Sequence, residues 1–296
     1  MSSNIVLNKN NIVNQTNNKL VYEFPSDVTF GEHDTVAVSH LNIYFSWFNI
    51  TAKNNNNFFQ YKWFDMNGDL TVIVDVTIKD GFYSINDLYE YIQSVMVSNG
   101  HYLETLDGSS YIYFVEFITN ATYYSTEVRL SSVSANMNFG AGVAPYTDYC
   151  KAPTTWTVPN TYMCPEVIIP TTNRFGEMLG FHSKTLTKDL TAQPSSNDKY
   201  SFLNDFSPNM LFASSYIITC TLVDNDFGKP NNVLYSFTIP PNVGFGDLIT
   251  TASDLIWSKI KPGRYRQFTI QIYDQDFNPL EILDGNILMV LSIMKK

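Results

Sequence analysis

The sequence predicts an all-β protein in which two antiparallel sheets pack as a sandwich or a jelly roll. The chain of 296 residues contains 19 Tyr and 21 Phe, and aromatic residues favour strands. Only 16% of the residues are charged, so the chain is poor in Glu and Lys, which favour helices. Runs of alternating or β-branched residues recur at irregular spacing, whereas two segments have helical spacing. An apolar fraction of 44% in a chain of this length is enough for a substantial core.

Two segments differ in composition from the rest of the chain. Residues 1–18 are polar and rich in Asn, and we expect a flexible N-terminal arm there. The segment at about 135–170 contains five prolines, which cannot donate ladder hydrogen bonds. We therefore expect a Pro-rich insertion or long loop that no intact central strand crosses. No Gly/Ser linker or repeat divides the remainder, so residues 19–296 are predicted to form one domain.

The first strands after the arm are predicted from period-two patterns. Residues 20–24 alternate between apolar and less apolar side chains, which is typical of a half-buried strand. Residues 35–48 are β-branched and aromatic, and we expect a long strand there. Residues 58–64 and 70–78 flank an Asn-Gly turn, which favours a tight connection, and they therefore predict a hairpin.

Two short helices are expected. Apolar residues recur three and four positions apart between Ser84 and Asn99, as on one face of a helix. Ser84 can cap the N-terminus of this helix with Asp87 three positions on, and Gly100 can end it. Residues 245–256 have the same spacing before a Pro-Gly pair and predict the second helix.

Further strands are expected on both sides of the Pro-rich segment, at 111–117, 126–130, 211–223, 233–240, 265–273 and 286–294. Both faces of the last of these strands are largely apolar. We therefore expect it to pair inside a sheet and to be covered on both faces.

Charge and cysteine content exclude several classes of protein. The net charge is −10 and there is no basic arm, so direct binding of nucleic acid is not expected. No segment has 18 unbroken apolar residues and the N-terminus lacks an apolar leader, so neither a membrane span nor secretion is expected. The three cysteines lack C-x-x-C spacing, which argues against disulfides and a zinc site.

Residue patterns that support catalysis or metal binding are weak. His33 is expected in a turn and His40 in a strand, and neither has a partner at metal-ligand spacing. Residues 224–228 lack the later Glu of an EF-hand and predict a hairpin turn, and residues 244–246 lack the Lys-Ser/Thr of a phosphate loop. Cys220 has apolar neighbours, as a buried strand thiol would. We predict no catalytic residue, metal or cofactor, and thus no enzyme.

Three segments together carry a family resemblance. Near the C-terminus, residues 264–273 lead into Asp-Gln and Asn-Pro turns, and Asp-Gly-Asn at 284–286 then precedes a final apolar strand. Residues 173–181 contain an FG-x-x-LGF element, and residues 78–84 contain a DG-x-Y element between a strand and a helix. In this order the three segments resemble the penton, or minor capsid, proteins of virophages and Polinton-like viruses.

The resemblance implies a structural virion protein with a single jelly roll that forms homopentamers at the five-fold vertices of an icosahedral capsid. Its partner there would be a double jelly-roll major capsid protein, and assembly would take place in the host cytoplasm or a virus factory. Residues 1–18 would then be a candidate tie to neighbouring capsomers.

A carbohydrate-binding attachment spike or lectin-like sandwich is the alternative. Trp156 and Tyr162, if exposed, would stack on the sugar rings of a host surface glycan.

Overall fold

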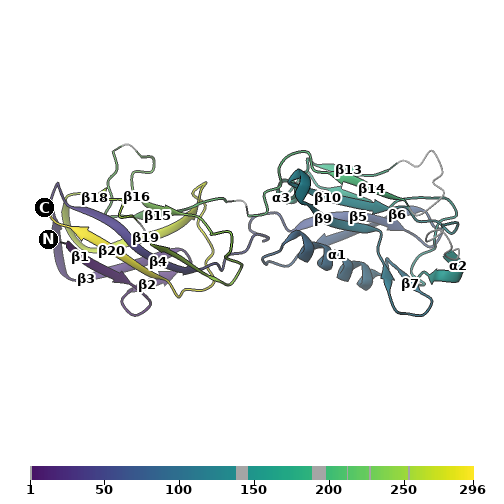
Figure 1. Cartoon of the computed structure of the whole chain (residues 1–296), viewed down its shortest axis with the longest axis horizontal. Helices are drawn as coiled ribbons and strands as arrows, with labels where there is room; N and C mark the ends of the chain where they lie inside the picture. Colours follow the sequence, from purple (N-terminus) through teal and green to yellow (C-terminus); the bar gives the residue numbers. More distant parts are fainter. Residues whose placement is uncertain (1, 138–145, 189–197, 212, 227, 253) are drawn as a thin grey trace. The chain divides into compact units, whose positions relative to one another are not determined.

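The computed structural model describes residues 2–137, 146–188, 198–211, 213–226, 228–252 and 254–296. The chain forms two compact units (Figure 1): unit 1 comprises Met1–Trp47 and Ala213–Lys296, and unit 2 comprises Phe48–Phe212. The single domain expected over 19–296 is therefore divided, and unit 2 has a hydrophobic core of its own. No helix among the described residues is long and apolar enough to cross a bilayer.

Unit 1 consists of two antiparallel sheets. Its strands are β1 (Ser2–Leu7), β2 (Asn14–Thr16), β3 (Lys19–Phe30), β4 (Thr35–Tyr44), β15 (Tyr216–Cys220), β16 (Val233–Phe237), β17 (Leu248–Ala252), β18 (Ser258–Lys259), β19 (Gly263–Asp274) and β20 (Leu288–Met294). The first sheet has the order β1-β20-β4-β17, with β18 also paired to β4. The second sheet has the order β16-β15-β19-β3-β2.

The strand order of unit 1 is that of a jelly roll. If β2 and β18 are set aside, the first sheet contains the first, eighth, third and sixth strands in chain order. The second sheet contains the fifth, fourth, seventh and second. Two interlocked Greek keys produce this order, so the predicted all-β jelly-roll class is confirmed. Unit 2 is inserted in the chain between the third and fourth strands.

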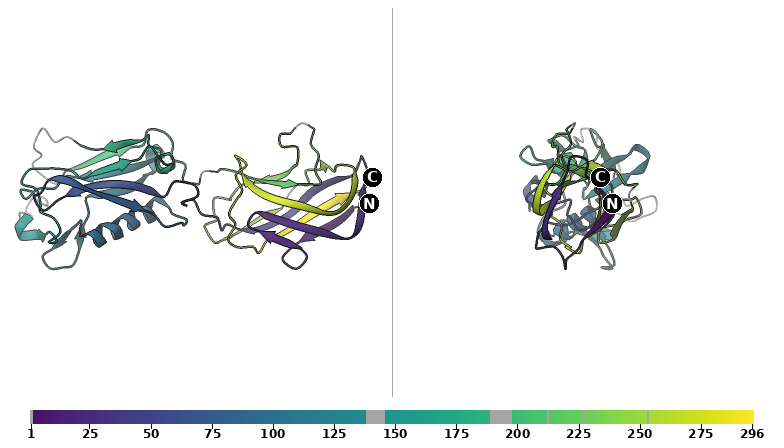
Figure 2. Two further views of the ribbon diagram at one scale, coloured as in Figure 1. Left: turned by 180° about the vertical axis from the view of Figure 1, so that it is seen from behind. Right: turned by 90° about the vertical axis from the view of Figure 1, so that its left-hand side faces the viewer.

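The last strand is central, as its apolar faces predict. β20 lies between β1 and β4, and Met289, Leu291 and Ile293 are buried. Phe268 and Ile270 of β19 supply buried side chains from the other sheet. The chain termini lie side by side at one end of unit 1 (Figures 1 and 2), because Ser2 pairs with Met294.

Residues 1–18 are not a flexible arm. β1 pairs along its whole length with β20, from Ser2 opposite Met294 to Leu7 opposite Met289, and Leu7 is fully buried. β2 pairs with β3, and the Asn18 side chain donates to the carbonyl of Ile272 over 2.8 Å. An edge strand such as β1 tolerates polar side chains that point to solvent, and the many Asn residues of this segment therefore concealed the strand. Because these residues complete the jelly roll, they do not provide the expected free tie to neighbouring capsomers.

The second predicted helix is also wrong. Within 245–256 the structure has β17, in which Ile249 is buried between the exposed residues Leu248 and Thr250. This burial follows the period of two that strand geometry imposes. Pairing with β4 outweighs the local helical spacing.

Unit 2 combines three small sheets with one long helix. Its elements are β5 (Phe58–Phe64), β6 (Leu70–Thr77), α1 (Ile85–Asn99), β7 (Leu103–Thr105), β8 (Tyr111–Ile112), β9 (Val115–Asn120), η1 (Ala121–Tyr123), β10 (Ser125–Ser131), α2 (Tyr146–Tyr149), β11 (Cys150–Lys151), β12 (Glu166–Ile169), α3 (Phe175–Leu179), β13 (Lys184–Leu186) and β14 (Lys199–Leu203). The sheets have the orders β13-β12-β5-β6, β14-β10-β9 and β11-β7-β8.

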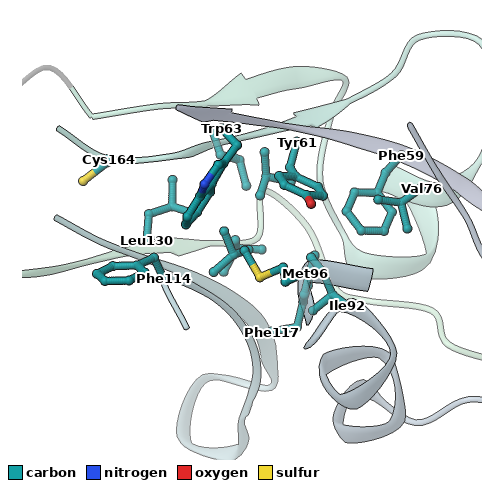
Figure 3. Packing of buried hydrophobic residues seen from close by; sticks show 14 of the residues in the cluster. Phe59, Tyr61, Trp63, Val76, Ile92, Met96, Phe114, Phe117, Leu130 and Cys164 are labelled. Atoms are coloured by element: carbon teal, nitrogen blue, oxygen red, sulfur yellow. The ribbon is translucent and has the colours of Figure 1, made fainter. Parts of the chain in front are cut away.

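The locally encoded elements of unit 2 are confirmed. β5 and β6 form the predicted hairpin. Ser84 and Asp87 form a reciprocal capping box at the start of α1, and Gly100 ends the helix at φ 72°. The buried face of α1 packs into an aromatic core, and Figure 3 shows Ile92 and Met96 beside the rings contributed by β5 and β9.

The Pro-rich segment contains a central strand after all. β12 lies between Pro165 and Pro170 in the chain and between β13 and β5 in its sheet. The prolines therefore flank the strand without removing its ladder hydrogen bonds. Part of the expected insertion, residues 138–145, lies outside the described residues.

Candidate functional site

The thiols of the chain are buried and protonated. Cys220 lies in β15 and is fully buried, as its apolar neighbours predict. Cys150 and Cys164 are buried as well. Burial raises the pKa of Cys150 to about 11 and that of the other two thiols to about 12. A nucleophilic thiolate therefore forms at none of these positions near neutral pH.

His101 is a buried histidine that sequence reasoning did not single out. Its Nδ1 atom lies 2.8 Å from the hydroxyl of Tyr61, and its ring stacks on Trp63 with centroids 5.2 Å apart. Burial lowers the pKa of His101 to about 4, so the ring is neutral at pH 7. His33 lies in a turn and His40 in β4, as expected. Among the described residues, no group of three or more His, Cys, Asp or Glu is placed so that it could hold a metal ion.

Glu127 is a buried carboxylate with a complete set of partners. It accepts hydrogen bonds from Arg129, from the Ser201 hydroxyl at 2.6 Å and from the Asn120 amide at 3.1 Å. The Arg129 hydrogen bond, followed by those from Ser201 and Asn120, holds the pKa of Glu127 at about 2 against the opposing effect of burial. The carboxylate links three strands, β9, β10 and β14, and is too stable as an anion to serve as a general base.

Two other sequence patterns form turns. The Asn225 amide donates to the carbonyl of Asn231 over 2.7 Å, which closes the connection between β15 and β16 as a hairpin. Residues 244–246 precede β17, and the Gly244 amide donates to the carboxylate of Asp247 over 2.9 Å. Each pattern has a structural role in a strand connection.

The FG-x-x-LGF element forms α3 and the turn that ends it. A side chain at Gly176 would place its Cβ 2.6 Å from the carbonyl oxygen of Phe181. Gly180 has φ 82°, and a Cβ there would lie 2.2 Å from the carbonyl oxygen of Phe206. Both glycines therefore allow backbone segments to approach more closely than any larger residue could.

The DG-x-Y element fixes the start of α1. Asp80 accepts a hydrogen bond from the Ala52 amide at 2.8 Å, and Gly81 forms an isolated bridge with Ile50. The Tyr83 amide donates to the Asn49 side chain, also at 2.8 Å. These three contacts fix the backbone just before Ser84, the residue that caps the N-terminus of α1.

The C-terminal turns are held by aspartates. Asp274 accepts hydrogen bonds from the amides of Asp276 and Asn278 at 2.9 and 2.8 Å. Asp284 accepts one from the amide of Asn286 at 2.8 Å. Side-chain caps of this kind favour tight turns, and they direct the chain from β19 into β20.

The aromatic residues proposed for sugar stacking are not available for it. Trp156 is 3% exposed and donates its indole N–H to the carbonyl of Gly100 over 2.8 Å. Tyr162 is 7% exposed and donates to the carbonyl of Asn136 over 3.0 Å. Both residues belong to the core of unit 2, so the alternative of a carbohydrate-binding module loses the two residues that suggested it.

The surface of unit 1 has two notable features, on different edges. A hollow of about 430 Å³ is lined by Lys9, Ile12, Gln15, Asn17, Ile282, Leu283 and Gly285. The Gln15 amide crosses it to the carbonyl of Gly285 over 2.8 Å. At the edge strand β17, Phe245 and Leu248 are each 41% exposed.

Comparisons with known proteins give a match among the solved structures. No protein-family model matches the chain, and no curated protein matches it. A structural neighbour is the mavirus penton protein. Its crystal structure covers 100% of this chain, which covers 99% of it in turn, with a TM-score of 0.48 and 11% sequence identity.

Proposed function

We propose that the chain is a structural, non-enzymatic capsid protein, a penton whose copies form a ring of five at the five-fold vertices of an icosahedral capsid. The observation that carries this proposal is the complete eight-strand jelly-roll order of unit 1. Capsid proteins are a principal class that uses this architecture. Since a fold alone does not define a function, the three resembling segments provide the link to pentons in particular.

The geometry of unit 1 suits a closed ring. Its two sheets end in β1 and β2 on one flank and in β17 and β16 on the other. A ring of more than two copies closes through heterologous contacts, in which each copy uses two different surfaces. A single jelly roll with two dissimilar flanks meets this requirement.

The proposed partners follow from this role. A double jelly-roll major capsid protein would surround each ring, and the protein would be located in the virion. With a net charge of −10, the chain is not expected to contact the genome through its phosphates.

Mass photometry of the purified full-length chain, combined with electron microscopy, tests this function. We expect particles of five copies with five-fold class averages, and density at the vertices when the chain is co-expressed with the major capsid protein. A stable monomer that stays out of capsids would refute the proposal, and a trimer would indicate a spike.

A further inference from the structure

We propose that adjacent copies in the ring join through two different surfaces of unit 1: the apolar edge around Phe245 and Leu248 on one copy, and the hollow around Ile12 and Leu283 on the next. We call these the β17 edge and the hollow. This inference rests on the proposed self-association and specifies the surfaces that carry it.

The β17 edge has the properties of a surface that a binding partner covers. β17 pairs with β4 on one side, and along its other side no strand of the described chain pairs with it. Leu248 is exposed at its start, and the Phe245 ring is held in place against Phe45, with centroids 5.8 Å apart. Exposed edge strands that carry large apolar side chains promote association, so proteins rarely leave them uncovered.

The hollow can receive such a surface. Leu283, at its rim, is 58% exposed, Ile12 is half-buried, and Ile282 is buried beneath. The hollow is open to solvent, has a volume of about 430 Å³, and combines this apolar rim with the polar side chains of Lys9, Gln15 and Asn17. The two apolar side chains of a neighbouring copy's β17 edge can contact that rim.

The two surfaces lie at the same end of the sandwich. Leu248 pairs with Tyr44 at the last position of β4. The Leu283 amide donates to the carbonyl of Ser46, two residues further along the chain, over 3.2 Å. Both surfaces are therefore level with the end of β4.

The hollow reaches from the end of β4 to the flank opposite β17. β17 forms one edge of its sheet and β1 the opposite edge. Lys9 and Ile12, in the connection from β1 to β2, and Gln15, in β2, line the hollow. A β17 edge on one flank and a hollow that opens toward the other flank are an arrangement in which one copy can contact the next around a ring.

Charge supports a second copy of this chain as the occupant. Asp247 lies between the two apolar residues of the β17 edge, and Lys9 lines the hollow. Neither side chain forms a salt bridge within the part of the chain that the structure describes. A contact between the two would be a rim pair, which fixes register and partner choice more than affinity.

Disulfide cross-linking with Leu248→Cys and Ile12→Cys in one full-length chain tests this interface, since Ile12 lines the hollow on the flank opposite β17. The native cysteines are buried, so the introduced thiols are the reactive ones under mild oxidation. We expect a ladder of linked chains that ends at five, and no linkage with either single variant. As a matched control, Glu32→Cys, at an exposed position in the turn at the other end of β4, replaces Leu248→Cys and should give no ladder.

A second variant separates failure of the interface from failure of the function. Leu248→Asp should weaken assembly at least about tenfold in protein concentration while leaving the melting temperature unchanged. Rings of five that persist in this variant, with no ladder from the cysteine pair, would refute the interface and retain the function. Linked dimers from a single cysteine variant would refute the two-surface arrangement. A wild-type chain that forms no ring at all would remove the function and this interface together.

Discussion

Replacing Leu7 by Ala should destabilise unit 1, although Leu7 lies in a segment whose composition is that of a flexible arm. Leu7 is fully buried opposite Met289, whereas its neighbour Val6 is 40% exposed. Removing a buried Leu side chain costs about 2–5 kcal/mol, and an exposed position in the same strand costs about 0.5 kcal/mol or less. Val6→Ala is therefore the matched control, since it changes the same strand on its other face.

Hydrogen exchange measured by mass spectrometry resolves this effect for each unit. A loss of about 3 kcal/mol speeds exchange through global unfolding of unit 1 by more than about a hundredfold. We expect this acceleration at the amides of β20 in Leu7→Ala, with little change in peptides of unit 2. If Leu7→Ala and Val6→Ala exchange alike, β1 is not an integral strand and the reasoning is wrong.

Three further predictions concern the folded units. A chain that ends at Asp284 lacks the central strand β20 and should give no cooperative unfolding transition for unit 1 in calorimetry. His101 has a pKa of about 4 in the folded protein and about 6.5 in the unfolded chain. Its contribution to the free energy of unfolding is therefore complete above pH 6.5 and declines by up to about 3 kcal/mol as the pH falls to 4. His101→Gln should remove this part of the pH dependence of stability, measured by urea unfolding. Gly180→Ala should cost several kcal/mol because its Cβ would meet the carbonyl of Phe206. Gly108→Ala is the control, because the nearest atom to its new Cβ would be 3.7 Å away while φ is 70°. It should cost only the backbone strain of about 1–2 kcal/mol, so its melting temperature should fall less than that of Gly180→Ala.

Sequence reasoning succeeded where the structure is determined by nearby residues. The cap and face of α1 depend on residues within one helix, and the β5–β6 hairpin depends on the turn between its strands. The jelly-roll class could be predicted from composition and strand spacing because many strands contribute to that signal.

The errors arose where a distant partner decides the outcome. β1 forms because β20 offers it an edge, and β17 replaces the expected helix because β4 pairs with it. β12 is central because its two prolines fall just outside its ladder. Each depends on pairing between residues far apart in the chain, which local patterns do not encode.

The β17 edge and the hollow were even harder to predict from the sequence than these strands. The residues of the hollow come from the segments around Ile12 and Leu283, which are separated by nearly the whole chain. Phe245 and Leu248 had helical spacing, and this concealed that they lie on an exposed strand edge. The sequence carried a weak signal for the ion pair of Glu127 and Arg129, since side chains two positions apart on a strand lie on the same face.

The inserted position of unit 2 imposes an order on biosynthesis. β1 and β4 leave the ribosome early, but their partners β17, β18 and β20 are translated only after unit 2. At about 5–20 residues per second, synthesis of the whole chain takes about 15–60 s. Unit 2 is continuous in sequence and can fold during that time, whereas unit 1 can close only after β20 has also left the ribosome. β1 and β4 remain without sheet partners while unit 2 is translated, so the yield of native protein should depend on chaperones that hold nascent chains.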